Sequence, residues 1–432
     1  WMNNTDKRNY KHGGLFCSLQ NAVIENLVIS SSCNFSGHSA GALGVFSEGS
    51  LTIRNVRNNA NVHGYFGSVG GFIGIMKNSQ QGQKTVLFSG CTNNGNVIGN
   101  ENNAGGFLGN VEGTTDLTLT LSNCRNNGDV IGSKNNTGGF IGFIKSHSMM
   151  SVMITNGKND GDMIGSYQNT GGFIGSVEGS ETTTITMTNC NNQGDIIGSK
   201  NNNGGLIGYI NTCESVTFSK GHNEGDIIGS RNNTGGLVGS IVKCANAMIS
   251  NSTNMGDMLG SESNVGGLVG YIGDTHMTLV SNCTNYERVS GSENYVGGIV
   301  GHVFLSQQQS TTVVINSVNK GNIMASSGLG CGLICAEYLE GSNGNLTVLN
   351  SMNKKRVMGY YAFGIANKVT KARNVVSIGN MLGSPAYSFW ASAEDADLLY
   401  GESFKCTNCG EDVTFMKKNS QTGFYDVVSG SD

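Results

Sequence analysis

Short apolar runs recur along this chain at a nearly constant spacing, and glycines frame each run. The clearest is Gly138-Gly139-Phe140-Ile141-Gly142. Equivalent motifs begin at Gly70, Gly105, Gly171, Gly204, Gly235, Gly266 and Gly297, with looser copies at Gly13, Ala40, Cys331 and Phe363. From residue 70 to residue 331 the steps between first positions run from 31 to 35 residues. A fixed period of this size is typical of stacked repeats in which each unit packs on its neighbours.

Within one period the apolar and polar positions predict three short strands. In the period that begins at Gly138 these are residues 139–144, the alternating stretch 150–155 and residues 162–164. Asparagine- and glycine-rich turns, 156–161 and 165–170, separate them, since both residue types tolerate a positive φ. Helical repeats of similar period need long amphipathic segments and few glycines. The pattern therefore predicts an all-β parallel β-helix (β-solenoid) of about twelve turns of 31–35 residues, with three short strands per turn.

The regularity of the motif predicts three regions. Residues 1–60 hold degraded N-terminal turns or a cap, residues 61–384 form the regular solenoid, and residues 385–432 form a C-terminal cap or docking segment. Atypical terminal units are expected in a solenoid because they cover strand edges that would otherwise be exposed.

Superposing the periods aligns asparagines in two columns. The first column is Asn58, Asn93, Asn126, Asn159, Asn192, Asn223, Asn254, Asn285, Asn319 and Asn353, and the second is Asn103, Asn136, Asn169, Asn202, Asn233 and Asn264. Amides stacked in register can hydrogen-bond from turn to turn. We expect both columns to be structural and to occupy turns that need residues tolerant of positive φ. The functional alternative is a row of ligand-binding amides.

Two adjacent apolar columns follow the glycines, one at Phe140 and its equivalents and the other at Ile141 and its equivalents. Adjacent residues of a strand face opposite ways, so only one column is expected to line the core. The other would cover a second layer or form an exposed apolar stripe, which usually marks an interface. The flanking glycines indicate a close backbone approach or a tight corner.

Composition narrows the classes of protein. Glycine accounts for 66 of 432 residues, proline for one (Pro385), and charged residues for 13%, with a net charge of −4. These values exclude collagen and proline-rich disorder, and no basic stripe indicates nucleic acid or anionic lipid. No apolar stretch reaches the roughly 18 residues of a membrane-spanning helix. Because the chain opens with Trp1 rather than methionine, we interpret it as a fragment of a longer precursor whose targeting signal is missing.

The twelve cysteines suggest bridges between turns. Cys91 and Cys124 share one column, and Cys213 and Cys244 share another. The spacing of neighbouring strands lies within the Cα separation that a disulfide accepts, so both pairs are candidate inter-turn disulfides that suit an oxidising compartment. Buried thiols are the alternative. A zinc site at the lone motif Cys406-Thr407-Asn408-Cys409 would need a second cysteine pair, and we expect no metal.

Glycosylation sequons supply further candidate sites. The candidate acceptors are Asn34, Asn135, Asn232, Asn251, Asn282 and Asn345. Asn135 and Asn232 occupy equivalent turns and are the preferred pair.

No residue pattern indicates catalysis. Asp129, Asp162, Asp195, Asp226 and Asp257 recur once per period, as expected of a structural turn or a weak cation ladder, whereas glycosidases and lyases need a unique local cluster. The seven histidines occupy unrelated phases of the repeat. We therefore expect no enzyme activity and no cofactor.

The repeat resembles the GLUG motif family over roughly residues 60–365. The best match is Asn264-Val265-Gly266-Gly267-Leu268-Val269-Gly270, followed by Ser281-Asn282-Cys283-Thr284-Asn285 and Val289-Ser290-Gly291. The resemblance implies an extracellular or cell-surface β-solenoid stalk or adhesive module without catalytic residues. We expect a structural rod, part of a filament or surface stalk, that associates through its ends with itself or with other surface proteins. The alternative is an adhesin that binds glycan or a partner protein along its flank. We expect no nucleic-acid partner.

Overall fold

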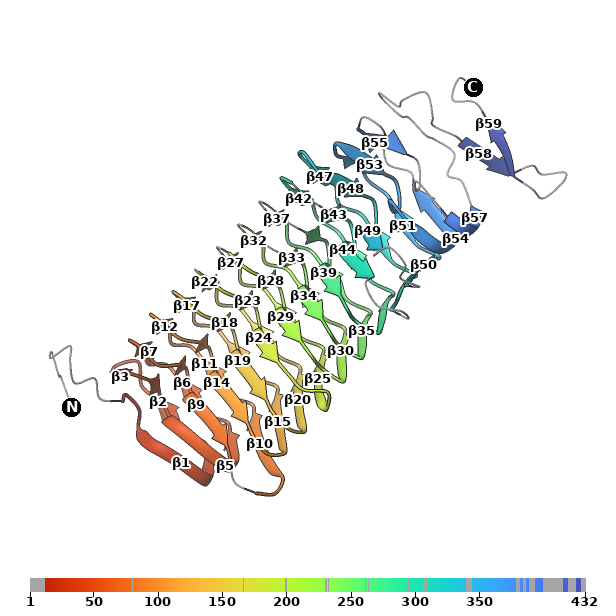
Figure 1. The fold of residues 1–432 in the computed structure, drawn as a ribbon. Coiled ribbons are helices and arrows are strands. Elements are labelled where there is room, and N and C mark those ends of the chain that lie inside the picture. The colour runs from red at the N-terminus through yellow and green to blue at the C-terminus, as the bar shows by residue number, and fades with distance from the viewer. Residues whose placement is uncertain are drawn as a thin grey trace. The chain divides into compact units, whose positions relative to one another are not determined.

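The computed structural model is an all-β parallel β-solenoid, as the repeat predicts (Figure 1). It describes residues 12–377 except 80, 166, 199, 230, 232, 261, 263, 294, 306–309 and 339–343, and also describes residues 381–383, 386–387, 393–398, 415–418 and 425–428. The chain divides into unit 1, Trp1–Thr217, and unit 2, Phe218–Asp432.

Each turn contains the three predicted strands and two shorter ones. In one turn of unit 1 they are β18 (Thr137–Gly138), β19 (Ile141–Ser146), β20 (Met150–Thr155), β21 (Lys158–Asn159) and β22 (Met163–Gly165). Each strand pairs in parallel with its equivalents in the turns before and after, which gives five ladders that we number I to V in this order. The three predicted strands are the longest, those of ladders II, III and V. Ladders I and IV consist mostly of two-residue strands that apolar periodicity is too coarse to detect.

The strands of unit 1 follow this order (Figure 1). Ladder I comprises β4 (Ala40–Gly41), β8 (Val69–Gly70), β13 (Ala104–Gly105), β18, β23 (Thr170–Gly171) and β28 (Asn203–Gly204). Ladders II and III share β1 (Phe16–Glu25) and β5 (Gly44–Arg54); ladder II continues with β9 (Ile73–Asn78), β14 (Leu108–Gly113), β19, β24 (Ile174–Glu178) and β29 (Ile207–Asn211), and ladder III with β10 (Lys84–Ser89), β15 (Leu117–Ser122), β20 and β25 (Thr183–Thr188). Ladder IV comprises β2 (Val28–Ile29), β6 (Arg57–Asn58), β11 (Thr92–Asn93), β16 (Arg125–Asn126), β21 and β26 (Asn191–Asn192), and ladder V comprises β3 (Asn34–Gly37), β7 (Asn61–Gly64), β12 (Val97–Gly99), β17 (Val130–Gly132), β22 and β27 (Ile196–Gly198). Strand β30 (Ser215–Ser219) contains the division between the units.

Unit 2 repeats the same five ladders. Ladder I comprises β33 (Thr234–Gly235), β38 (Val265–Gly266), β43 (Val296–Gly297), β48 (Leu329–Cys331), β53 (Tyr361–Phe363) and β56 (Ala386–Tyr387). Ladder II comprises β34 (Val238–Val242), β39 (Val269–Gly273), β44 (Val300–Leu305) and β49 (Ile334–Tyr338), and ladder III comprises β35 (Asn246–Ser250), β40 (Met277–Ser281), β45 (Thr311–Ile315) and β50 (Asn345–Leu349). Ladder IV comprises β31 (His222–Asn223), β36 (Thr253–Asn254), β41 (Thr284–Asn285), β46 (Val318–Asn319) and β51 (Met352–Asn353), and ladder V comprises β32 (Ile227–Gly229), β37 (Met258–Gly260), β42 (Val289–Gly291), β47 (Ile323–Ala325), β52 (Val357–Met358) and β55 (Met381–Leu382). Strand β54 (Val369–Ser377) pairs with β50, β51 and β57 (Ala393–Leu398), and β58 (Phe415–Lys418) pairs with β59 (Tyr425–Val428) in antiparallel.

Both apolar columns line the core, so the expectation that only one would do so was wrong. Phe140 and Ile141 are each 0% exposed, as are their equivalents in neighbouring turns. The amides of both residues donate to the carbonyl of Phe173, at 2.9 and 2.8 Å. The chain therefore bends between β18 and β19, and at this corner two adjacent side chains point to the same side.

The glycines of the motif are required by close backbone approach. A Cβ on Gly138 would overlap the carbonyl oxygen of Ile141. A Cβ on Gly139 would overlap the carbonyl oxygen of Gly172 and lie 2.5 Å from Asn159 Oδ1. Neither glycine has a positive φ. The prediction of a close approach at a tight corner is confirmed.

In the turns up to the motif at Cys331, the length of the repeat varies in only one part of the turn. From ladder IV to the first position of the next motif the chain takes 13 residues in these turns, as from Lys158 to Gly171 in unit 1 and from Thr253 to Gly266 in unit 2. The last such arc, from Met352 to Phe363, takes 11. From the motif glycine forward to ladder IV the chain takes 20 residues between Gly138 and Lys158 but 18 between Gly235 and Thr253. In the turns up to Cys331 the corner between ladders II and III therefore absorbs the variation, and the arc through ladders IV and V has a fixed length.

Candidate functional site

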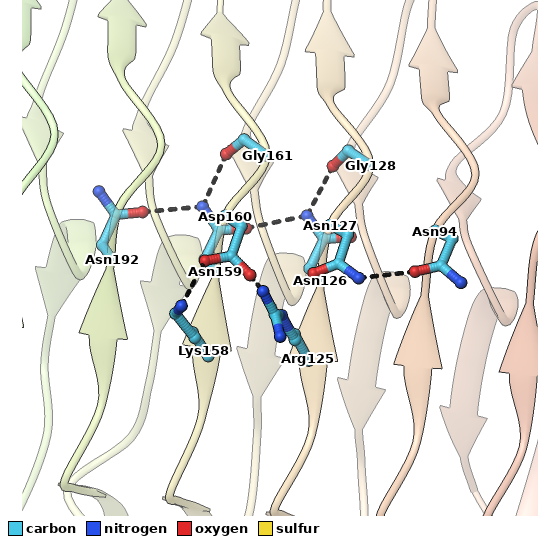
Figure 2. A network of polar contacts seen from close by, with 10 residues as sticks. All are labelled: Asn94, Arg125, Asn126, Asn127, Gly128, Lys158, Asn159, Asp160, Gly161 and Asn192. Atoms are coloured by element: carbon cyan, nitrogen blue, oxygen red, sulfur yellow. Dashed lines mark hydrogen bonds and ion pairs between the residues drawn. The ribbon is translucent and has the colours of Figure 1, made fainter.

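The first asparagine column is a buried, hydrogen-bonded amide ladder along ladder IV (Figure 2). Asn126 Nδ2 donates to Asn159 Oδ1 at 2.9 Å and to the carbonyl of Gly128 at 2.7 Å. Asn159 Nδ2 donates to Asn192 Oδ1 at 2.7 Å and to the carbonyl of Gly161 at 2.8 Å. The ladder asparagines are 0% exposed, and both hydrogens of these Nδ2 groups are used. This arrangement supports the structural interpretation and leaves no capacity for a dissolved ligand.

The expectation that the first asparagine column occupies positions of positive φ was wrong, because none of these ladder asparagines has a positive φ. The left-handed positions lie three residues earlier in each turn, at Asn123 (φ 52°), Asn156 (φ 51°) and Asn189 (φ 53°). These amides form an exposed third column: Asn156 Nδ2 donates to Asn123 Oδ1 at 3.0 Å and Asn189 Nδ2 to Asn156 Oδ1 at 2.8 Å. The sequence carries the signal for this column, since these asparagines recur at the period of the repeat.

The second asparagine column also forms an amide ladder, but it runs in the opposite direction. Asn136 Nδ2 donates back to Asn103 Oδ1 at 3.0 Å, and Asn169 Nδ2 donates back to Asn136 Oδ1 at 2.9 Å. In unit 2, Asn264 Nδ2 donates to Asn233 Oδ1 at 2.8 Å. The predicted turn-to-turn bonds are confirmed in both columns.

A polar network lies on the surface beside the buried ladder (Figure 2). The Asp160 carboxylate accepts from Arg125 Nε and lies 3.0 Å from Lys158 Nζ. Asn127 Nδ2 donates to Asn94 Oδ1 at 2.6 Å. Because the two cationic side chains are 49% and 36% exposed, such ion pairs contribute at most about 1 kcal/mol each.

The aspartate column bonds to the backbone of the next turn. Asp129 Oδ1 accepts from the amide of Asp162 at 3.0 Å, and Asp162 Oδ1 accepts from the amide of Asp195 at 2.9 Å. In unit 2, Asp226 Oδ1 accepts from the amide of Asp257 at 2.8 Å. Within the described ranges no group of three or more His, Cys, Asp or Glu side chains could hold a metal ion. These contacts are those of a structural turn.

The ten cysteines of the described chain are thiols in this structure. The buried thiols of Cys91 and Cys124 belong to adjacent turns and hydrogen-bond to each other, and this bond together with burial raises the pKa of Cys124. Cys213 lies in unit 1 and Cys244 in unit 2, each 2% exposed. Both disulfides therefore stay predictions. Cys406 and Cys409 lie outside the described residues.

The candidate glycan acceptors differ in accessibility. Asn34, Asn251, Asn282 and Asn345 are exposed. Asn135, one of the preferred pair, is partly buried, and its Nδ2 donates to Asn102 Oδ1 and to the carbonyl of Glu101, both at 2.9 Å. Asn232 lies outside the described residues. Glycosylation stays a prediction, with the four exposed sites better placed than Asn135.

One place in unit 2 departs from the repeat and gathers aromatic and titratable side chains, and the sequence did not single it out. Val300 pairs with Ile334 but Val303 pairs with Ala336, so Gly301 and His302 together oppose Cys335 in a β-bulge. Tyr295 occupies the position that asparagine holds in the second column. Its ring stacks on His302 with centroids 3.9 Å apart.

The chemistry of this cluster is that of packed, poorly reactive groups. Tyr295 Oη donates to Glu337 Oε2 at 3.0 Å, and His302 Nε2 lies 3.4 Å from the same oxygen. Burial lowers the pKa of His302 to about 4, so the imidazole is uncharged at neutral pH and this contact is not an ion pair. Burial, followed by the charge of Glu337, raises the pKa of Tyr295 to about 12. A base with a pKa near 4 is poorly matched to catalysis near neutrality.

The first described strand of unit 1 carries exposed apolar side chains. Among the described residues β1 pairs with β5 alone. Large apolar side chains around it are exposed: Leu15 by 51%, Phe16 by 44%, Val23 by 67% and Val28 by 63%. Exposed apolar edge strands are templates for pairing with another strand.

Comparison of the chain with protein-family models, with curated proteins and with solved structures finds no match. Within the described residues no helix is long and apolar enough to cross a membrane.

Proposed function

We propose that this protein is a structural, non-catalytic solenoid that associates with further copies of itself through strand β1. The observation that carries the proposal is the exposure of Phe16 and Val23 on a ten-residue strand that, among the residues the structure describes, pairs with β5 alone. Such an edge offers a row of backbone donors and acceptors together with apolar side chains.

A second copy is the occupant that this edge fits best. Each turn is built to hydrogen-bond to a turn of the same kind, through both backbone ladders and amide columns. A net charge of −4 on 432 residues adds little repulsion between copies. An asymmetric, head-to-tail contact that does not close into a ring produces an open fibre.

The resemblance of the motif to the GLUG family supports an extracellular or cell-surface setting. We infer a divergent GLUG-like repeat protein, in which the glycine-framed corner is kept. The exposed sequons at Asn251 and Asn345 suit a secreted protein. The uncharged His302 and the engaged amides of the asparagine ladder support a non-catalytic role.

The test is self-association of the purified chain and of Val23→Lys, measured by analytical ultracentrifugation and negative-stain electron microscopy. We expect the parent to form concentration-dependent elongated assemblies and Val23→Lys to remain monomeric, because the charge would be buried at the contact. Ile197→Lys is the matched control, since Ile197 is 41% exposed but lies in ladder V away from β1. A monodisperse parent, or assembly lost only in Ile197→Lys, would contradict the proposal.

A second candidate function is adhesion along the flank. Two exposed tyrosines each lie under a lysine, with Lys200 Nζ 4.1 Å from the ring centroid of Tyr167 and Lys320 Nζ 4.2 Å from that of Tyr286. Exposed aromatic faces of this kind can stack on apolar faces of ligands. Glycan-array binding that disappears in Tyr167→Ala would favour this alternative.

A further inference from the structure

One turn of unit 2 replaces two motif glycines with cysteine. The corner between β48 and β49 reads Cys331-Gly332-Leu333-Ile334-Cys335, where the preceding turn has Gly297-Gly298-Ile299-Val300-Gly301. In that preceding turn a Cβ on Gly297 would lie 2.7 Å from the carbonyl carbon of Val300, the residue before Gly301. A side chain at the first glycine position therefore points across the corner towards the residue that precedes the third position.

Cys331 and Cys335 belong to the same buried apolar cluster. Cys331 and Cys335 are 0% exposed and pack with Phe363, against the partly buried Tyr295 and Leu329. Cys335 Sγ donates to the carbonyl of Val296 at 3.4 Å, and Cys331 Sγ donates to Asn367 Oδ1 at 3.8 Å. No other cysteine of the described residues belongs to this cluster.

The bulge in β44 lies directly against this pair. Two residues of β44, Gly301 and His302, oppose Cys335 alone. Cysteine side chains at positions that are glycine in other turns leave less room at the corner. The extra residue in β44 forms a bulge, which bends that strand. The turn that carries cysteine at both positions is therefore the turn that the bulged strand pairs with.

We propose that Cys331 and Cys335 form a reversible dithiol–disulfide pair that reacts with low-molecular-weight disulfides of the glutathione type. The thiolate of one cysteine attacks the small disulfide, which releases one small thiolate and leaves a mixed disulfide on the protein. The second cysteine, as its thiolate, attacks the protein-bound sulfur and releases the second small thiolate. The protein loses two electrons and two protons, and one molecule of the small disulfide becomes two thiols.

Burial determines how fast this reaction proceeds. The thiolate is the attacking species, and burial raises the pKa of Cys331 well above its ordinary value. Strand β53, which carries Phe363, pairs with β48 and covers the cluster. Exchange therefore requires local opening of this turn, and its rate rises with pH and with mild denaturant.

The test is peptide mapping of the full chain, purified in reduced form and incubated with oxidised glutathione at pH 8, with and without a low urea concentration. Thiols are then blocked with N-ethylmaleimide and the protein is digested with trypsin. The peptide 321–354 contains Cys331 and Cys335 and no other cysteine. We expect this peptide to lose two hydrogens and carry no blocking group, to form faster with urea, and to revert on reduction.

The matched variants are Cys331→Gly and Cys335→Gly, which restore the residue that the repeat uses at each position. Each single variant should yield a glutathione adduct or a blocked thiol on this peptide and no internal disulfide. Peptide 321–354 of the parent that keeps two blocked cysteines under conditions that oxidise other thiols of the chain would overturn the proposal. So would linkage of either cysteine to a different peptide. Both outcomes are read in the parent protein and do not depend on the folding of a variant.

Discussion

The buried amide ladder makes each asparagine depend on its equivalents in the turns on either side. Removing the side chain of Asn159 takes away three buried hydrogen bonds, those with Asn126 Nδ2, with the carbonyl of Gly161 and with Asn192 Oδ1. Each buried group that loses its partner costs about 1–3 kcal/mol. We predict that Asn159→Ala lowers the free energy of unfolding by about 3–5 kcal/mol, measured by urea denaturation.

The matched control for this prediction is Asn127→Ala. Asn127 is exposed and its Nδ2 donates a hydrogen bond to Asn94 Oδ1 on the surface (Figure 2), so removal of its side chain should cost less than about 1 kcal/mol. Equal losses in the two variants would show that burial of the ladder does not contribute to stability.

Burial of His302 predicts a pH dependence of stability in unit 2. Its pKa falls from 6.5 to about 4 on folding, so between these values the unfolded chain binds a proton that the folded chain does not. Stability therefore decreases as the pH falls from about 6.5 towards 4, by at most about 3 kcal/mol from this group. Urea denaturation at pH 7 and pH 4.5 should show a smaller loss in His302→Gln than in the parent.

His276→Gln is the control for this pH dependence, because His276 is exposed in the same unit. It should retain the full loss of stability of the parent. An unchanged loss in His302→Gln would contradict a buried, uncharged imidazole.

At the scale of the strand and its corner, the aromatic stack of unit 1 is a replaceable packing element. The rings of Phe72, Phe107, Phe140 and Phe173 stack in sequence with centroid separations of 4.8, 4.8 and 4.6 Å. Later turns place leucine in the same column, beginning with Leu206. We predict that Phe140→Leu costs about 1 kcal/mol and Phe140→Ala about 3–5 kcal/mol in urea denaturation. If both substitutions cost the same, the column requires an aromatic ring rather than apolar volume.

The strands of each turn could be predicted from the sequence only where they are long enough to show alternation. The stretch 150–155 is predicted with its observed bounds, those of β20, because its apolar residues alternate. The two-residue strands β18 and β21 escaped prediction because two residues are too few to show alternation and each strand ends in glycine or asparagine. The corner at Phe140 and Ile141 escaped because strand alternation was assumed where the chain bends.

At the scale of the whole chain, the repeat allowed the solenoid to be predicted from the sequence, but it did not reveal the places where single turns differ from the repeat. The parallel solenoid and the amide ladders follow from spacing alone, since stacking brings residues one period apart together. The contact of His302 with Tyr295 depends on a one-residue bulge, and no periodic pattern reports a bulge. The exposure of β1 depends on what lies beside the first turn, which a repeat does not encode.

The fixed arc through ladders IV and V has a consequence for how such a chain can change. Residues can be gained or lost at the corner between ladders II and III, such as residues 147–149, without shifting the ladder asparagines against one another. Segmental duplication can therefore multiply whole turns while this corner diversifies. The same property makes the corner a suitable place to graft a foreign peptide, which would be displayed at the regular interval of the stacked turns.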